Sequence, residues 1–307
     1  MIESNTVYII QIFTIYNSNK MANLKEIRNR ITSVSSTMQI TSAMKMVSAA
    51  KLKRAQDAIT AMRPYAQKLT ELLQSLSATL EEGAGGDFTT QREVQNVLVV
   101  AITSNRGLSG AFNSNVVKET RRMLDTKYAG KKVDFITIGK KGHDVISKNN
   151  LVITNHNAVF DALNFENVAV IADELMLIFK EGRYDKIELV YNQFKNAATQ
   201  IIQVEQFLPL QPIASDVVVP SVDYIFEPSK EEIVLTLIPK MLKMQLYKAL
   251  RDSFAAEHGA RMTAMHKATD NATELRDQLK LTYNKARQAA ITNEILEIVG
   301  GAEALKN

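Results

Sequence analysis

The 307-residue chain has 37 basic and 33 acidic side chains, for a net charge of +4, and contains neither cysteine nor tryptophan. The absence of cysteine excludes disulfides and thiolate metal sites. The modest positive charge permits an acidic protein partner, a nucleic acid or an anionic membrane surface, and it selects none of them. No apolar run reaches the roughly 18 residues that a membrane-spanning helix requires.

The first twenty residues differ from the rest of the chain. Residues 7–16 (VYIIQIFTIY) are apolar and β-branched. No basic segment precedes them and no small-residue cleavage site follows, which argues against a secretory signal. A more typical protein sequence begins at Met21 (MANLKEIR). We therefore expect residues 1–20 to be a non-native or disordered leader, and the alternative is a weakly associating tail.

A long helical pattern follows the leader. From Leu24 to Leu80, apolar residues occupy fourteen of the seventeen positions reached in alternating steps of three and four. This spacing predicts a coiled-coil helix over residues 21–82, which would be roughly 85 Å long. Pro64 should kink this helix or remove one backbone hydrogen bond. Residues 83–87 (GAGGD) predict its end and a domain boundary.

The apolar seam of this helix is interrupted once. Thr41, Lys45 and Ser48 occupy seam positions, while the neighbouring apolar residues are displaced to other positions: Ile40, Met44, Met46 and Val47. Either the partner surface changes here, or the helix rotates to face a different element. A basic patch follows, made of Lys45, Lys51, Lys53 and Arg54. It is either a solvated face or a contact for an acidic protein surface or nucleic acid.

The middle of the chain, residues 94–210, has the pattern of an α/β domain. Apolar runs of strand length alternate with helical segments, which predicts a mostly parallel sheet covered by helices. We expect strands at 97–102, 133–138, 151–154, 187–193 and 200–207, and helices at 113–124, 141–148 and 167–180. Four prolines then indicate an extended linker over 211–229, before a second long helix over 230–307 that would be roughly 110 Å long.

Two loops of the α/β domain could bind a phosphate. Residues 103–113 (TSNRGLSGAFN) follow a buried strand and open a helix, the place where α/β folds bind phosphates. The segment matches neither glycine-rich nucleotide motif, so a structural or partner-contacting loop is the favoured interpretation. Residues 139–142 (GKKG) predict a solvated turn. The four histidines lack metal-ligand spacing, although His258 has acidic neighbours, and Ser109 has no histidine–carboxylate pair. We thus expect no catalytic residue, no cofactor and no metal.

Three stretches together resemble the γ subunit of the bacterial rotary F-type ATP synthase: residues 40–52 (ITSAMKMVSAAKL), the loop 104–113, and the block from Ala260 to Leu305. The resemblance covers residues 21–305. It implies an antiparallel coiled coil of the N- and C-terminal helices with a central Rossmann-like α/β domain. It also implies a non-catalytic rotor shaft that couples proton or sodium flow through the c ring to ATP synthesis or hydrolysis at the β subunits.

The resemblance further implies the partners and their contacts. The α and β subunits form a ring around the shaft, while the ε subunit and the c ring lie at its foot. Nucleic acid is not a partner, and the membrane is reached only through the complex, at the cytoplasmic face of the inner membrane. The implied ring contacts are Met44, Arg261, Arg287, Gln288, Thr292, Ile295 and Ile298, and the implied foot contacts are Tyr224 and Glu227. Relatives often carry a cysteine where this chain has Ser109.

Two other classes remain open from the residues alone. A nucleic-acid-bridging protein would use the long helices as arms, and it would bind duplexes with a steep salt dependence. A small nucleotide-dependent enzyme would need catalytic groups near Arg106, and the isolated chain would bind nucleotide.

Overall fold

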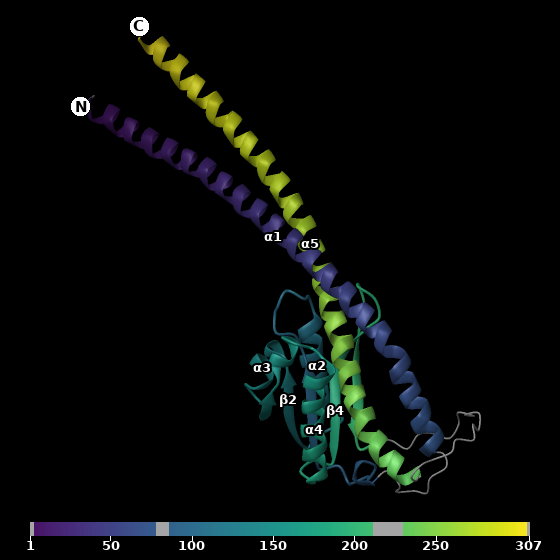
Figure 1. The fold of residues 1–307 in the computed structure, drawn as a ribbon. Helices are drawn as coiled ribbons and strands as arrows, with labels where there is room; N and C mark the ends of the chain where they lie inside the picture. The colour runs from purple at the N-terminus through teal and green to yellow at the C-terminus, as the bar shows by residue number, and fades with distance from the viewer. Residues whose placement is uncertain (1–2, 78–85, 211–229, 306–307) are drawn as a thin grey trace. The chain divides into compact units, whose positions relative to one another are not determined.

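The computed structural model describes residues 3–77, 86–210 and 230–305, with side chains described for residues 24–69, 72, 86–210 and 232–305. The chain divides into two compact units. Unit 1 contains Met1–Lys45 and Met265–Asn307, and unit 2 contains Met46–Ala264. The long helices α1 (Glu3–Ser77) and α5 (Lys230–Ala304) each contribute one part to each unit (Figure 1).

Unit 2 is built around a five-stranded sheet with the order β3-β2-β1-β4-β5. The strands β1 (Asn96–Ile102), β2 (Lys132–Ile138), β3 (Val152–Asn155) and β4 (Lys186–Phe194) run parallel. The edge strand β5 (Gln200–Leu208) pairs antiparallel with β4. In the central strand β1, every residue from Val97 to Ile102 is buried and apolar, because both faces of the sheet are covered. The predicted mostly parallel sheet is confirmed.

Helices pack on both faces of this sheet (Figure 1). On one face, α2 (Phe112–Asp125) and α3 (Lys140–Ile146) enclose a core that includes Val97, Val99, Val116 and Phe135. On the other face, α4 (Phe165–Lys180) and the first half of α5 cover Leu98, Val100, Ile136 and Leu189. Successive residues of β1 therefore point to opposite cores, as the period of two in a strand requires.

The second part of α1 packs on α5 within unit 2. Leu52 and Ala55 are buried against Ala255, and Leu69 joins the larger core with the half-buried Met62 and Ala66. Each long helix continues through a proline in unit 2: α1 through Pro64 and α5 through Pro239.

In unit 1 the two long helices are antiparallel. Arg28 donates to the hydroxyl of Tyr283 at 2.8 Å, Thr269 donates to Thr41 at 2.8 Å, and the Lys45 ammonium lies 3.4 Å from His266 Nδ1. The α5 number falls as the α1 number rises, which is the signature of antiparallel pairing. The predicted coiled coil of the terminal helices is confirmed.

The interrupted seam keeps its register. Thr41 and Ser48 are buried, whereas Ile40, Met46 and Val47 are about 60% exposed, at 60, 64 and 57%. Thr41 and Lys45 still contact Thr269 and His266 of α5, so the alternative of a helix rotated away from α5 is wrong there. Of the four displaced apolar residues, Met44 is half-buried and the other three face outward.

Several predicted boundaries shift or lie outside the described residues. The backbone of residues 3–20 is helical, and the leader assignment stays a prediction. The end of the first helix was expected at 82, but residues 78–85 are outside the described part, as is the whole linker 211–229. Two short 3₁₀ helices, Gly86–Phe88 and Asn157–Phe160, were not predicted.

Candidate functional site

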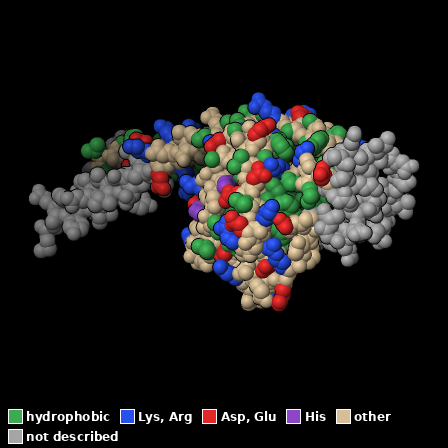
Figure 2. All heavy atoms as spheres, turned by 60° about the horizontal axis from the view of Figure 1, so that its bottom comes forward, with side chains coloured by type: hydrophobic (Ala, Val, Ile, Leu, Met, Phe, Trp, Pro, Cys, Tyr) green, Lys and Arg blue, Asp and Glu red, His purple; other side chains and the backbone are tan. Residues whose placement is uncertain are grey.

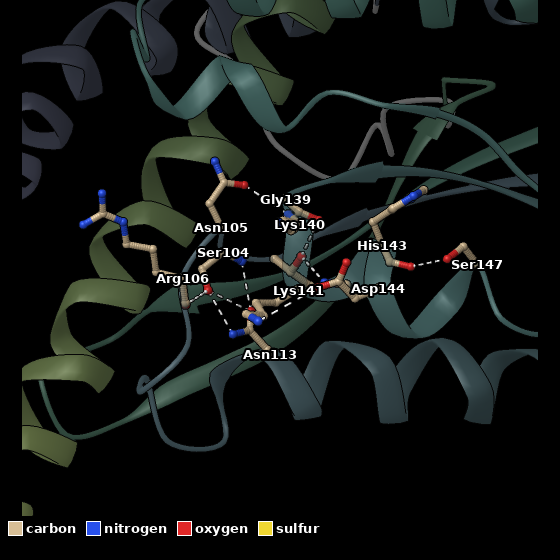
Figure 3. Close-up of polar contacts among 12 residues, drawn as sticks. Ser104, Asn105, Arg106, Asn113, Gly139, Lys140, Lys141, His143, Asp144 and Ser147 are labelled. Carbon is tan, nitrogen blue, oxygen red and sulfur yellow. Dashed lines mark hydrogen bonds and ion pairs between the residues drawn. The ribbon is translucent and has the colours of Figure 1, made fainter.

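The loop between β1 and α2 (residues 103–111) is held by one amide side chain. Asn113, in the first turn of α2, accepts from the main-chain amide of Ser104 at 2.9 Å and donates to Ser104 Oγ at 2.9 Å and to Ser109 Oγ at 3.3 Å (Figure 3). Ser104 Oγ also lies 2.7 Å from the carbonyl oxygen of Arg106, to which it donates. The side chain of Arg106 points away from this network. The loop is thus closed upon itself.

The amides at the start of α3 are also occupied by oxygens of the chain. Lys140 N donates to Asn105 Oδ1 at 3.0 Å, Lys141 N to the carbonyl oxygen of Ser104 at 3.0 Å, and Gly142 N to Thr103 Oγ1 at 2.9 Å (Figure 3). An anion at a helix start needs free amides. These three are used internally, so the start of α3 offers none of them to a phosphate.

The prediction of a solvated turn over residues 139–142 is wrong. Gly139 and Gly142 are buried against Thr103, and a Cβ on Gly139 would lie 2.3 Å from the Thr103 carbonyl oxygen. Gly139 also has φ of +113°, in a region that favours glycine. The two glycines therefore serve the close approach of β1 and the start of α3, and only the two lysines between them are exposed.

Arg261 on α5 fastens this loop from outside. Its Nη2 donates to the carbonyl oxygens of Arg106 and Gly107 at 3.0 and 3.2 Å, and its Nη1 donates to Glu257 Oε1 at 2.6 Å. The residue is only 7% exposed. The loop tip, Leu108, has φ of +63° and an exposed side chain. Sequence reasoning missed this contact because its acceptors are main-chain oxygens, which carry no residue-type signal.

Burial perturbs the titration of the two groups beside Arg261. Burial raises the pKa of the Glu257 carboxyl, and the nearby charge of Arg261 opposes that rise. Burial, with the positive charges of Arg261 and Lys51, lowers the pKa of His258 to about 3. His258 is therefore neutral near pH 7. Among the described residues, no group of three side chains has the arrangement of a metal site.

Comparison with known proteins identifies the family. A family model described as ATP synthase matches residues 23–305. The ATP synthase gamma chain of Flavobacterium psychrophilum is 78% identical over 286 residues, covering 93% of this chain and all of the relative. The gamma chain of Flavobacterium johnsoniae is 79% identical over 93% of this chain and 99% of the relative. The chain belongs to the ATP synthase gamma chain family.

Solved structures agree with this fold. The Tetrahymena thermophila mitochondrial ATP synthase, in a structure of the central stalk and c ring, contains a chain 27% identical to this one, with a TM-score of 0.56 over 75% of this chain and 99% of that chain. A chain of the Euglena gracilis mitochondrial ATP synthase is 22% identical, with a TM-score of 0.67 over 92% of this chain and 95% of that chain. As an ATP synthase gamma chain, the protein is a non-catalytic subunit of a membrane-bound complex. No helix in the described ranges is both long and apolar enough to cross a bilayer.

The structure places the predicted ring contacts of this gamma chain in two different settings. Six of them lie in unit 1: Met44, Arg287, Gln288, Thr292, Ile295 and Ile298. Met44 is half-buried, whereas the five α5 residues are exposed. Arg261 lies in unit 2 and is buried with partners of its own chain. Tyr224 and Glu227, the predicted foot contacts, are outside the described residues.

Further exposed apolar side chains accompany these residues. At the C-terminal end of unit 1 they are Ile291, Leu296 and Val299 on α5, and Leu305 just after it. In unit 2 they include Met46, Val47 and Leu108. The sequence indicates the exposure of the group on α5, because the apolar stripe of this helix shifts register near Ile291. Apolar residues that leave the stripe no longer face the partner helix.

Proposed function

We propose that this gamma chain is the central rotor shaft of its ATP synthase. In this proposal, ion flow through the c ring turns the chain inside the ring of α and β subunits. Each orientation of an asymmetric shaft stabilises a different conformation of each β subunit, so rotation drives the three catalytic sites through states of different nucleotide affinity. Hydrolysis drives the same cycle in reverse.

The observation that carries the proposal is the exposed apolar end of α5. Ile291, Ile295, Leu296, Ile298 and Val299 are between 48 and 67% exposed, within about two and a half turns of one helix. A water-soluble protein rarely leaves so many adjacent large apolar side chains in solvent, and such patches mark binding sites for other proteins. An apolar sleeve formed by the α and β subunits would cover this end and still let it turn.

We keep the predicted polar contacts with the α and β subunits, except that Arg261 is no longer proposed as a direct contact. Arg287, Gln288 and Thr292 are exposed on α5 and can reach carboxylates and amides of a surrounding subunit. Arg261 is committed to Glu257 and to the loop carbonyls, so we propose that its effect on the ring is indirect. In unit 2, Met46, Val47 and Leu108 are apolar and Lys51, Arg54 and Arg106 are basic, all exposed. This composition suits an acidic loop that also carries apolar residues.

The foot contacts are part of the same proposal. Tyr224 and Glu227 would face the ε subunit and the c ring, which places the chain at the cytoplasmic face of the bacterial inner membrane as a peripheral subunit. Support comes from the similar chains in central-stalk and rotor structures of other ATP synthases.

The two alternative functions gain no support. The face in Figure 2 has Lys and Arg interspersed with Asp and Glu and with apolar side chains, rather than the single-sign stripe that tracks a nucleic-acid backbone. The first amides of α3 are occupied by the chain's own oxygens, as described above.

Single-molecule rotation tests the proposal. Because the chain has no cysteine, Lys148→Cys supplies one exposed attachment point for a bead, whereas Ser109 in the loop is buried. The variant is assembled with cysteine-free α and β subunits and fixed through the ring. ATP-dependent rotation in one direction is the expected result. An assembled, ATP-hydrolysing complex whose bead does not rotate would overturn the proposal.

A further inference from the structure

Helix α5 packs along the sheet through the apolar residues between Val234 and Leu250. Beyond them, one short segment, residues 256–263, contacts two loops of the α/β layer in the last turns before unit 2 ends at Ala264. This segment contacts two separate parts of the layer: the β1–α2 loop (residues 103–111) and the β4–β5 turn (residues 195–199). Both contacts lie within unit 2. They use different residues of α5, so each can be examined by itself.

The contact with the β4–β5 turn is a close backbone approach. The Thr263 hydroxyl donates to the carbonyl oxygen of Ala197 at 3.0 Å. A Cβ on Gly259 would lie 3.2 Å from Ala197 Cα and 3.3 Å from the Phe194 ring. Glycine inside a helix is costly by about 1 kcal/mol relative to alanine. At this position the absence of a side chain on Gly259 lets the β4–β5 turn lie directly against the backbone of α5.

The contact with the β1–α2 loop combines hydrogen bonds and packing. Arg261 donates to the carbonyl oxygens of Arg106 and Gly107. Ala256 and Ala260 pack against Phe112, which begins α2. Asn192 on β4 donates from Nδ2 to the carbonyl oxygen of the same phenylalanine at 2.9 Å. The loop is therefore held between the sheet and α5.

The β4–β5 turn and the β1–α2 loop are each held by hydrogen bonds that do not involve α5. Asn196 Oδ1 accepts from the amides of Ala198 and Thr199 at 3.0 and 2.7 Å, which closes the β4–β5 turn. Asn113 closes the β1–α2 loop in the same way (Figure 3). A helix fastened to two pre-ordered segments cannot roll on the sheet without breaking hydrogen bonds at both.

We propose that Gly259, Arg261 and Thr263 are positioning residues that lock the α/β layer onto α5, so that a torque applied to the layer passes into the helix at this junction. The inference rests on the proposed rotor function. It assigns to the segment 256–263 a mechanical role that is separate from any contact with the ring.

The test compares two isosteric substitutions on the same helix. Thr263→Val removes the hydroxyl that bonds Ala197, and Thr263→Ser keeps it. Thr273→Val is the matched control, because the Thr273 hydroxyl donates only to the Thr269 carbonyl within its own helix. Each variant is combined with Lys148→Cys, and the bead on the α/β layer reports angular fluctuation while the complex waits for ATP. Amide exchange in the turn 195–199 of the assembled complex is measured in parallel.

The expected result is a larger angular variance for Thr263→Val than for Thr273→Val, with the wild-type variance restored in Thr263→Ser. Loss of one net hydrogen bond should speed exchange of the turn amides about fivefold. Faster exchange with unchanged angular variance would show a purely local structural role and overturn the inference. If Thr263→Val does not assemble, Gly259→Val decides the matter, because its side chain would push against Ala197 and Phe194 in the β4–β5 turn.

The two proposals fail in different ways. If the complex that carries only Lys148→Cys does not rotate, the rotor function is rejected. If it rotates, and Thr263→Val and Thr273→Val give equal angular variance, only the mechanical role of the segment 256–263 is rejected.

Discussion

Thr269 on α5 donates a hydrogen bond to Thr41 on α1 at 2.8 Å, at the first of the three polar positions that interrupt the apolar seam of α1. Each hydroxyl also has a carbonyl acceptor in its own helix, Met265 for Thr269 and Met38 for Thr41. The pair therefore satisfies two polar groups at a position where the seam could have been filled by leucine or alanine. A seam with a polar step is weaker but specifies its register.

Replacing the buried threonine should strengthen the pairing. In Thr41→Val the Thr269 hydroxyl keeps its bond to Met265, so no buried group loses its last partner. We expect the free energy of unfolding to change by less than about 1 kcal/mol, in the stabilising direction. Denaturant unfolding of the purified chain measures it. A loss of several kcal/mol would mean that the inter-helix bond matters more than the apolar contact.

Gly139→Ala should be severely destabilising. The new Cβ would meet the Thr103 carbonyl oxygen at 2.3 Å, and φ is +113°. The loss should be at least about 3 kcal/mol, because the backbone of β1 or α3 must move. Gly130→Ala is the control, since Gly130 also has positive φ, +77°, but nothing within 4 Å. It should cost about 1 kcal/mol. Equal losses in the two variants would contradict the steric argument.

Arg261→Lys should loosen the β1–α2 loop although the charge is kept. Lysine cannot reproduce a guanidinium that bonds Glu257 and two carbonyl oxygens at once. Hydrogen exchange of the amides of residues 105–110 should become faster by about tenfold, the effect of losing about 1.4 kcal/mol of local stability. Wild-type exchange in the lysine variant would show that charge alone holds the loop, as expected for a simple ion pair.

His258 should make the protein sensitive to acid. Its pKa is about 3 in the folded chain and near 6.5 when unfolded, so below pH 6.5 only the unfolded chain takes up the proton. This lowers stability by about 1.4 kcal/mol per pH unit as the pH falls. In His258→Gln this contribution of histidine protonation to the free energy of unfolding is absent. The drop in unfolding free energy from pH 7.0 to pH 5.5 should therefore be smaller in the variant than in the wild type, by about 1 to 2 kcal/mol.

Asp252 should act with the opposite sign. Burial raises its pKa to about 6 from 3.8; Lys248 and Arg63 oppose the rise and Glu205 adds to it. As the pH falls through 6, the folded chain takes up the proton first, so stability is gained, and the gain is complete below the unfolded pKa. Asp252→Asn removes this gain, so the variant should lose stability more steeply than the wild type between pH 6.5 and 5. An unchanged pH profile would show that this carboxyl is ionised throughout.

The fold could be predicted because its signals are local and periodic. The continuous apolar run Val97–Ile102 has the length of a strand covered on both faces, and the seam from Leu24 has the spacing of a long paired helix. The junction on α5 could not be predicted in this way. Arg261 and its acceptor Gly107 are 154 residues apart, and the acceptor is main chain. Gly139 was misread for a related reason, because a solvated turn and a close approach to Thr103 have the same sequence pattern.

The pairing of the two ends of the chain has a consequence for biosynthesis. Thr41 and its partner Thr269 are 228 residues apart in sequence. At a synthesis rate of roughly 5 to 20 residues per second, the ribosome needs about 10 to 45 s to make the intervening chain. During that interval the apolar seam of the first helix has left the ribosome and its partner does not yet exist. The apolar face of the first helix is therefore unpaired for that time, and the α/β layer is synthesised before the second half of the coiled coil exists.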